Sequence, residues 1–242
     1  MTSGALFTMK PICIIPARGG SKGVKGKNTR KLNGRPLISY AIEKAINSKI
    51  FSEVFVSTEN EKIANITKKF GAKIPFLRPK YLAKDNSDIG DTLYHTIKNL
   101  LEIGYDFDSV MLLDCTCPFV DIQDMKGAWK LFVKSNCDSV YSGVLAHPNP
   151  YFGMVELNSN GFLFTPKKTK KILYRRQDAP KVYGLNAIVM FNSKKFMKTK
   201  KLLTDKSKIY EISKHHGHMI DFEYDFLVAE LLMKEFNNKK QN

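Results

Sequence analysis

Short apolar runs alternate with helix-like stripes along the first 144 residues. The strand-like runs are "PICIIP" (11–16), "EVFVST" (53–58), "SVMLLD" (109–114) and "DSVYSGV" (138–144). The helix-like stripes, in which apolar residues recur at helical spacing, lie within 38–46, 63–70, 93–101 and 122–133. This order of strands and helices predicts an α/β fold with a doubly wound, mostly parallel sheet.

Local signals bound two of the predicted helices. Gly71 follows the stripe 63–70, and glycine readily adopts the backbone conformation that closes a helix. Asp121 precedes the stripe 122–133, where its carboxylate can accept hydrogen bonds from the first helical N–H groups. The segment "AKIPF" (72–76) predicts a further short strand.

The alternation breaks after residue 144. From "NPYFGMVEL" through the turn "NSNG" (158–161) to "FLFTP", the pattern is typical of a hairpin. The run "LNAIVMF" (185–191) predicts a return to the sheet, and "DFLVAELLMKEF" (225–236) predicts a closing amphipathic helix. We therefore expect a small arm, which leaves the sheet at about residues 145–180.

Length and composition limit the class of protein. The 242 residues fit a single domain, predicted at 10–236 with the arm included, and residues 1–8 resemble a leader or tag. Hydrophobic residues make up 43% of the chain, but none of its apolar runs approaches the roughly 18 residues of a membrane span. Four cysteines are too few for a disulfide framework in a chain of this length, which favours a cytoplasmic setting.

The formal net charge of +16 leaves two kinds of partner open: nucleic acid, or phosphorylated and carboxylated substrates. Much of the excess lies in the lysine runs 166–171 and 193–201, which have little aromatic interleaving and are typical of solvated surface. A nucleic-acid surface would combine clustered basic and aromatic residues. Here cations also gather in a loop between a strand and a helix, so we expect no nucleic-acid partner.

That loop is "ARGGSKGVKGKN" (17–28), directly after the first predicted strand, where the ligands of parallel sheets bind. Its glycines allow main-chain N–H groups to face phosphate oxygens. Its cations are Arg18, Lys22, Lys25 and Lys27. The spacing matches neither the G-x-G-x-x-G fingerprint nor a P-loop, so the loop predicts a polyphosphate site of another type.

The segment "IIPARGGSKGVKGKN" closely resembles the nucleotide-binding signature of the acylneuraminate cytidylyltransferases, the CMP-sialic acid synthetase family. Further similar segments follow in the family's order: "LISYAIEKAINS", "VFVSTENEKIA", "FGAKIPFLRPKYLAKDNSD", "RRQDAPKVYGLNAIVMF" and "IDFEYDFLVAE". The resemblance implies attack of the anomeric hydroxyl of a nine-carbon α-keto acid sugar on the α-phosphate of CTP, with Mg²⁺ as cofactor. It also implies a homodimer in which the arm crosses to the partner's site.

The resemblance assigns roles within the glycine loop. Arg18 and Lys27 match the family's catalytic cations, and we assign both to the triphosphate, with Lys27 near the α-phosphate. The other nucleotide-binding positions implied in the loop are Ala17, Gly19, Ser21, Lys22 and Asn28. At Lys25 the family commonly has proline, so simple solvent exposure is an equal alternative.

Later segments imply contacts with the rest of the nucleotide and with the sugar. Arg78 matches a position near the nucleotide. The candidates for base and ribose are Asn86, Ser87 and Asp88, which equally suit an N-cap of the next helix. The sugar-side candidates are Arg175, Arg176, Gln177 and Asn186. Arginine suits the sugar carboxylate because its fork can bind both oxygens, although the two arginines also suit an ordinary surface pair.

Two departures from the family bear on the substrates. In "LLDCTCPFV" (112–120), Asp114 stands where sialic acid enzymes commonly have a glutamine, and the family's terminal arginine is lost. In "HMIDF", Met219 replaces one aspartate of the metal pair and leaves Asp221 as the Mg²⁺ ligand. The candidate helpers are Asp225 and Glu223. The cluster of His215, His216 and His218 is interpreted as a polar loop rather than a transition-metal site.

Asp114 also affects the expected sugar. A carboxylate beside an acidic substrate costs Coulomb energy unless it meets a donor. The segments "LLDCTCPF", "NPYF" and "RRQDAPKVYGLNA" resemble the legionaminic acid branch, whose sugars are 5,7-diamino-9-deoxy nonulosonates. We therefore expect a legionaminic-type acid to be preferred over N-acetylneuraminic acid.

Two alternatives remain open. One is another sugar nucleotidyltransferase, either of the KDO type or using a different nucleotide, although KDO enzymes usually have proline where this chain has Asn28. The other is a basic nucleic-acid-binding protein without catalysis.

Overall fold

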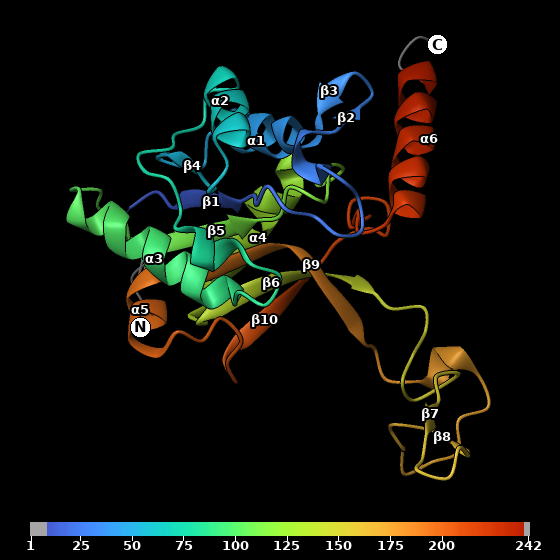
Figure 1. The fold of residues 1–242 in the computed structure, drawn as a ribbon. Helices are drawn as coiled ribbons and strands as arrows, with labels where there is room; N and C mark the ends of the chain where they lie inside the picture. The colour runs from blue at the N-terminus through green and yellow to red at the C-terminus, as the bar shows by residue number, and fades with distance from the viewer. Residues whose placement is uncertain (1–8, 240–242) are drawn as a thin grey trace.

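The computed structural model describes residues 9–239 and contains a six-stranded sheet (Figure 1). Its strands are β1 (Ile12–Pro16), β4 (Val54–Ser57), β5 (Ser109–Leu113), β6 (Ser139–Leu145), β9 (Tyr183–Asn192) and β10 (Ser207–Glu211). They lie in the order β10-β6-β9-β5-β1-β4. Strand β9 runs antiparallel to β5 and β6, whereas the other neighbours pair in parallel, so the predicted mostly parallel sheet is confirmed. The predicted leader, residues 1–8, lies outside the described residues.

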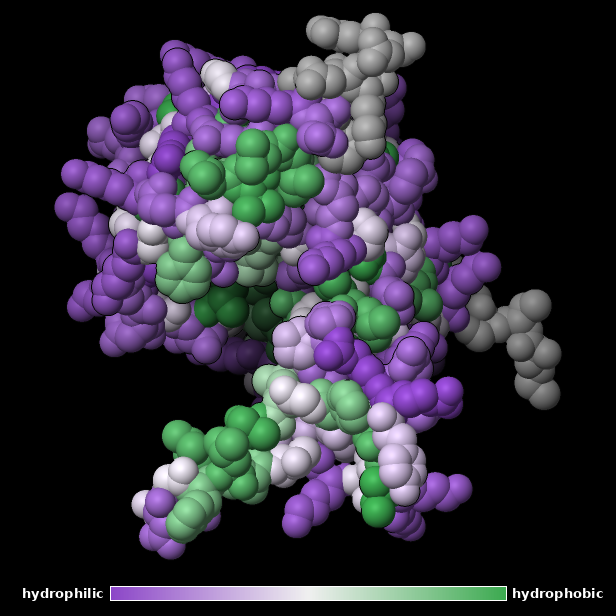
Figure 2. Space-filling view, turned by 90° about the vertical axis from the view of Figure 1, so that its right-hand side faces the viewer, coloured by the Kyte–Doolittle hydropathy of each residue, from purple (hydrophilic) through white to green (hydrophobic). Residues whose placement is uncertain are grey.

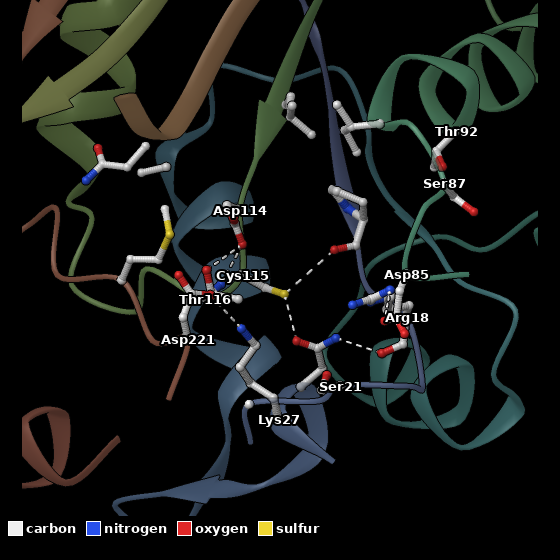
Figure 3. A pocket seen from close by; sticks show the side chains of 18 of the residues that line it. Arg18, Ser21, Lys27, Asp85, Ser87, Thr92, Asp114, Cys115, Thr116 and Asp221 are labelled. Carbon is white, nitrogen blue, oxygen red and sulfur yellow. Dashed lines mark hydrogen bonds and ion pairs between the residues drawn. The ribbon is translucent and has the colours of Figure 1, made fainter. Parts of the chain in front are cut away.

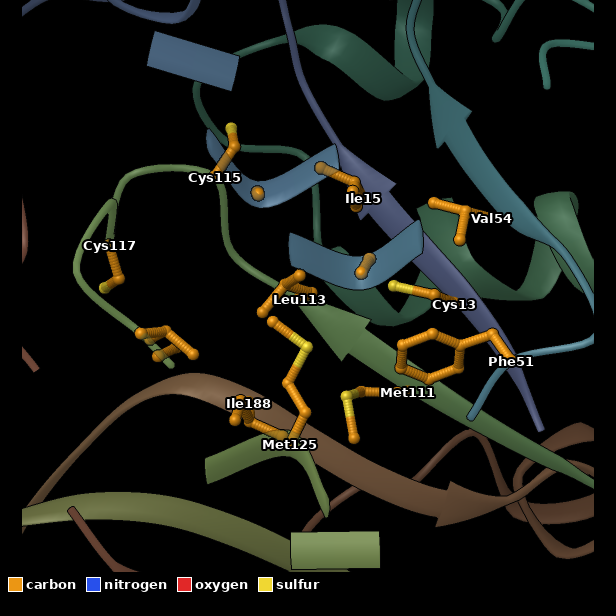
Figure 4. Close-up of a cluster of buried hydrophobic side chains, with 14 of the residues drawn as sticks. Cys13, Ile15, Phe51, Val54, Met111, Leu113, Cys115, Cys117, Met125 and Ile188 are labelled. Carbon is orange, nitrogen blue, oxygen red and sulfur yellow. The ribbon is translucent and has the colours of Figure 1, made fainter. Parts of the chain in front are cut away.

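Helices cover both faces of the sheet, as a doubly wound fold requires. They are α1 (Leu37–Ser48), α2 (Glu61–Lys69), α3 (Ile89–Glu102), α4 (Ile122–Ser135), α5 (Ser193–Thr199) and α6 (Glu223–Lys239). Successive residues of a strand point to opposite faces, so Ile15 packs with α1, α2 and α4, whereas Ile14 packs with α3 and α5. Figure 4 shows the first of these clusters, in which Cys13 lies beside Phe51 and Met125 lies beside Ile188.

Most predicted element ends are confirmed, and one predicted strand is wrong. Asp121 caps α4 in a reciprocal capping box with Asp124, and Gly71 follows α2 with a φ of 88°. In "AKIPF", however, a single bridge joins Lys73 to Phe55 instead of a strand. Pro75 has no N–H and cannot donate to a ladder, which limits pairing there.

Several strands and one helix of the structure are not predicted by the sequence pattern. The strand β10 and the helix α5 lie in lysine-rich sequence that hides their periodicity. A short hairpin of β2 (Lys31–Leu32) and β3 (Arg35–Pro36) follows the glycine loop. Together with α6, the residues between β1 and α1 form a third apolar cluster that includes Val24, Ile220 and Phe226.

The predicted arm is present between β6 and β9. It carries the small hairpin of β7 (Glu156–Leu157) and β8 (Leu163–Phe164) and projects away from the sheet (Figure 1). Figure 2 shows hydrophobic side chains along this projection, and the most exposed of them include Phe162, Ile172 and Tyr174. Between residues 9 and 239, no helix combines the length and apolarity needed to cross a membrane.

Candidate active site

A pocket of about 720 Å³ opens at the carboxyl ends of β1 and β5, beside β9. It brings together most of the residues that the sequence analysis selected. These are Arg18, Ser21, Lys22, Lys27, Asn28, Arg78, Ser87, Asp114, Asn186 and Asp221. Figure 3 shows two groups of polar side chains in it. Arg18 and Asp85 lie on one side, and Lys27, Asp114, Thr116 and Asp221 lie on the other.

The glycine loop is held close to its surroundings at two glycines. A Cβ added to Gly23 would lie 2.0 Å from the carbonyl oxygen of Asp221, so only glycine lets the loop approach this backbone. The N–H of Gly19 donates to Glu59 over 2.6 Å, and Arg78 donates to the other oxygen of Glu59 over 2.9 Å. Glu59 therefore ties the loop to the buried Arg78, a link between distant segments that sequence periodicity could not reveal.

Lys27 connects the loop to the segment before α6. Its Nζ donates to the carbonyl oxygen of Ile220 over 2.6 Å and to Oδ1 of Asp221 over 3.0 Å. The Lys27 side chain is only 13% exposed, whereas that of Asp221 is 52% exposed. The ammonium is therefore fixed at the pocket wall, and the carboxylate remains accessible to a ligand. Glu223, a predicted helper of Asp221, is instead bound by Arg30, which also lies over the ring of Phe226.

Arg18 and Lys22 share one carboxylate. Arg18 Nη1 lies 2.9 Å from Oδ1 of Asp85, and Lys22 Nζ lies 2.8 Å from Oδ2 of the same residue. The hydrogen bond from Lys22 is the main cause that lowers the pKa of Asp85, which keeps this carboxyl ionised. Asp85 lies within "KDNSD", the segment whose predicted nucleotide contacts are instead Asn86, Ser87 and Asp88.

Other loop residues that were predicted to bind the nucleotide make hydrogen bonds within the protein. The buried Asn28 donates to the carbonyl oxygen of Arg18 over 2.9 Å and accepts from the thiol of Cys115 at 3.3 Å. Burial raises the pKa of this thiol. Ala17 donates its N–H to Ser57 in β4. Among the described residues, neither Ala17 nor Gly19 is part of the pocket lining.

The sugar-side candidate Asp114 meets donors of its own chain. Its Oδ1 accepts from both the N–H and the hydroxyl of Thr116, each over 2.8 Å, and this reduces the cost of its charge. Asn186 donates to the carbonyl oxygen of Gly217, while its buried Oδ1 has no hydrogen-bond partner within the described part of the chain. The next residue, Ala187, has a φ of 58°, an uncommon backbone conformation at the pocket wall.

Three other candidates have capping or neighbouring positions. Asp88 caps α3 by accepting from the N–H of Gly90, which confirms the predicted N-cap alternative. Asn86 and Asp88 line an adjacent cavity beside α3, and Ser87 lines both cavities. Asp225 accepts from the N–H groups of Asp221 and Phe222, so its carboxylate supports the start of α6.

The predicted sugar arginines lie on the arm. Arg175 pairs with Asp178 over 3.1 Å, and Arg176 contacts His147 beside Gln177. The described lining of the active-site pocket includes no residue of the arm between 146 and 182. Within one chain, these side chains therefore do not join the pocket.

The histidine cluster makes polar contacts within the fold. His216 Nδ1 lies 2.7 Å from Oδ2 of Asp124, and His218 Nε2 lies 2.9 Å from the carbonyl oxygen of Asp225. Burial, together with neighbouring cationic groups, lowers the pKa of His215. These contacts agree with the interpretation as a polar loop.

The oxygen ligands in the pocket fit Mg²⁺. Asp221 and Asp114 both line it. Among residues 9–239, no group of three or more histidine, cysteine, aspartate or glutamate side chains could hold a metal. Mg²⁺ does not need such a group, because it accepts one or two carboxylates and completes its shell with phosphate oxygens and water.

Comparisons with known proteins agree with this geometry. A family model described as cytidylyltransferase matches residues 12–242. The CMP-N,N'-diacetyllegionaminic acid synthase of Campylobacter jejuni is 33% identical, covering 92% of this chain and 94% of the relative. The pseudaminic acid cytidylyltransferase of the same organism is 32% identical, covering 93% and 97%.

A solved structure of CMP:2-keto-3-deoxy-manno-octonic acid synthetase in complex with CTP shares the fold, with a TM-score of 0.70 and 16% identity. It covers 94% of this chain and 99% of that one. The match of the family model over nearly the whole chain, and the two relatives above 30% identity, agree with the resemblance in the glycine loop. The chain belongs to the cytidylyltransferase family and is a nucleotidyltransferase of the CMP-nonulosonate synthetase type.

Proposed function

We propose that the protein transfers CMP from CTP to the anomeric hydroxyl of a nine-carbon α-keto acid sugar. The observation that supports this most directly is the pocket, in which Arg18, Lys22 and Lys27 lie around one cavity with the carboxylates Asp114 and Asp221. Membership of the cytidylyltransferase family supports CTP as the nucleotide. The printed names of the two Campylobacter jejuni relatives support a nonulosonic acid as the acceptor.

In this reaction, the sugar oxygen forms a bond to the α-phosphorus, the bond from that phosphorus to the bridging oxygen breaks, and pyrophosphate leaves. The hydroxyl proton passes to solvent or to a base. Arg18 and Lys22 are suited to the leaving phosphates. Lys27, fixed by its two hydrogen bonds, is suited to the charge that develops at the α-phosphate. Positioning and charge compensation supply most of the catalysis that such a transfer needs.

Mg²⁺ is the proposed cofactor. When bound, it would neutralise phosphate charge and orient the leaving pyrophosphate. The exposed carboxylate of Asp221 would hold it, and phosphate oxygens and water would complete its shell. Asp225 is a weaker candidate, because its carboxylate already accepts two backbone N–H groups.

A homodimer is the proposed assembly, with the arm of one chain at the site of the other. Arg176 and Gln177 lie on the arm and do not join their own chain's pocket, as expected if they act in trans. The exposed hydrophobic residues of the arm also favour burial against a partner. We propose a cytoplasmic location, where CTP is available and the four buried thiols stay reduced.

A legionaminic-type acid is the proposed preferred sugar. The resemblance around Asp114 and Arg176 supports it, as does the name of one relative. Because a second relative of similar identity is named for pseudaminic acid, that sugar belongs in every comparison.

Pyrophosphate release tests the function. The assay pairs CTP, UTP, ATP and GTP with legionaminic, pseudaminic, N-acetylneuraminic and KDO acids, each with Mg²⁺ or with a chelator. We expect release only with CTP, a nine-carbon acid and Mg²⁺. Release that needs no acid, or that is fastest with KDO or with another nucleotide, would contradict the proposal.

A further inference from the structure

Asp85 lies between the two cations that are assigned to the leaving phosphates. Each of its carboxylate oxygens meets a different cation, Arg18 at 2.9 Å and Lys22 at 2.8 Å. All three residues line the active-site pocket. A carboxylate that bridges two phosphate-binding cations stands where an anionic ligand would bind.

The segment that carries Asp85 is anchored on both sides but exposed at its tip. Before the tip, the N–H of Arg78 donates to Thr58, and Leu82 is buried. After the tip, Asp88 caps α3. The Asp85 side chain itself is 48% exposed, so it can leave the two cations without disturbing buried structure.

From this arrangement we infer that Asp85 is a positioning residue that occupies the pyrophosphate subsite between turnovers. It holds Arg18 and Lys22 in place while the pocket is free of nucleotide, and it competes with pyrophosphate for them after the reaction. The inference rests on the proposed function, because it needs these cations to bind the leaving phosphates.

The exchange is feasible on electrostatic grounds. A triphosphate or pyrophosphate with bound Mg²⁺ has more oxygen acceptors than one carboxylate, so it can displace Asp85. Exposed ion pairs are individually weak, so Asp85 would not prevent nucleotide binding. It would lower the affinity for all polyphosphates by a modest factor and thereby favour the release of pyrophosphate.

Binding measured by calorimetry tests the inference without turnover. The full-length protein is titrated with pyrophosphate and with CTP, each with Mg²⁺ and without sugar. We expect Asp85→Asn to tighten the Kd for pyrophosphate about three- to tenfold, and Asp85→Glu, which keeps the charge, to remain close to the parent. The control is Asp91→Asn, since Asp91 is exposed on α3 and pairs with Lys200 rather than with the loop.

A double variant separates direct pairing from a general change in charge. If Asp85 acts through Lys22, the tightening caused by Asp85→Asn should become smaller in a Lys22→Ala background. Equal or weaker pyrophosphate binding by Asp85→Asn, or the same tightening by Asp91→Asn, would overturn the inference and leave the proposed function intact. Failure of the parent protein to bind either CTP or pyrophosphate would overturn both.

Discussion

The glycine loop and the arm carry the cations predicted to bind the nucleotide and the sugar, respectively. The loop is packed against its own chain, whereas the arm is exposed to solvent. In the loop, Val24 is buried against Ile220 and Phe226, and Lys27 donates two hydrogen bonds to the segment before α6. On the arm, Ile172 and Tyr174 are 79% and 82% exposed. A single chain therefore fixes the loop, whereas the hydrophobic side chains of the arm extend into solvent. The difference fits the proposed arrangement, in which one chain supplies the nucleotide half of the site and the arm of a partner completes the sugar half.

The largest expected effect is the loss of the fixed ammonium. Lys27→Ala should reduce kcat for pyrophosphate release on the order of a hundredfold or more, because it removes a fixed charge from the position that we propose for the α-phosphate. Asp221→Ala should cause a similar loss through the metal. The matched control is Lys25→Ala, since Lys25 is an exposed cation of the same loop. If Lys27→Ala keeps the parent turnover, the assignment of the loop is wrong.

A smaller but still large effect is expected from the backbone contact of the loop. Gly23→Ala places a Cβ 2.0 Å from the Asp221 carbonyl oxygen, so the loop and the segment before α6 must separate. A shift of about 1 Å at a catalytic group can cost up to about a hundredfold in rate, and we expect a tenfold or greater loss of kcat/KM. Gly20→Ala is the control, because nothing lies within 4 Å of the added Cβ. Equal activity of the two variants would show that the tight approach is dispensable.

The sequence predicted much of the core because periodicity reports which residues are buried. The apolar runs at β1, β4, β5 and β6 and the caps at Asp121 and Gly71 depend on local sequence alone. The strand β10 was missed because its alternation lies among lysines, and "AKIPF" was assigned a strand although Pro75 limits its pairing.

The predictions for the site divide in the same way. The loop cations could be located from a local motif; Arg18, Lys22 and Lys27 line the pocket, whereas Lys25 is not part of its described lining. Glu59, which accepts from the N–H of Gly19, and Asp85, which pairs with Arg18 and Lys22, could not be located in this way, since each joins segments far apart in the chain. The sequence offered one signal for Glu59, which is a polar residue directly after the predicted strand 53–58. The position of Arg176 away from its own pocket follows from the course of the whole arm, which no local pattern encodes.

The arm allows the most direct test of whether the two halves of the site come from different chains. If Arg176 serves the partner's sugar, Arg176→Ala should raise the KM for the sugar about tenfold and change the KM for CTP little. Co-expressed chains that carry Arg176→Ala and Lys27→Ala should then regain activity, because one of the two sites in each mixed dimer has both residues. At sugar concentrations well below the KM, where Arg176→Ala homodimers contribute little, random pairing would give about a quarter of the parent activity.

The controls for this mixture are each variant alone and a mixture in which both chains carry Lys27→Ala. Activity no higher than the sum of the separate variants would mean that each chain uses its own arm. A monomer by light scattering at the assay concentration, with full activity, would also contradict the shared site.

The smallest expected effect concerns Asp114, which lies between the two halves of the site at the end of β5. Asp114 lines the pocket, and its Oδ1 already accepts from the N–H and the hydroxyl of Thr116. Asp114→Gln removes the carboxylate charge and supplies an amide donor instead. Because the carboxylate is only partly available to a substrate, the change should act on the choice of sugar more than on catalysis.

We expect the ratio of kcat/KM for legionaminic over N-acetylneuraminic acid to fall about threefold, a shift typical of one modest polar contact, while the KM for CTP stays constant. The comparison is made by competition between the two sugars in one reaction. Thr116→Val is a second variant, which removes the hydroxyl donor to Asp114 Oδ1, keeps the backbone N–H donor and does not change the charge of Asp114. An unchanged ratio in Asp114→Gln would remove Asp114 from sugar selection and leave that choice to Asn186 and the arm.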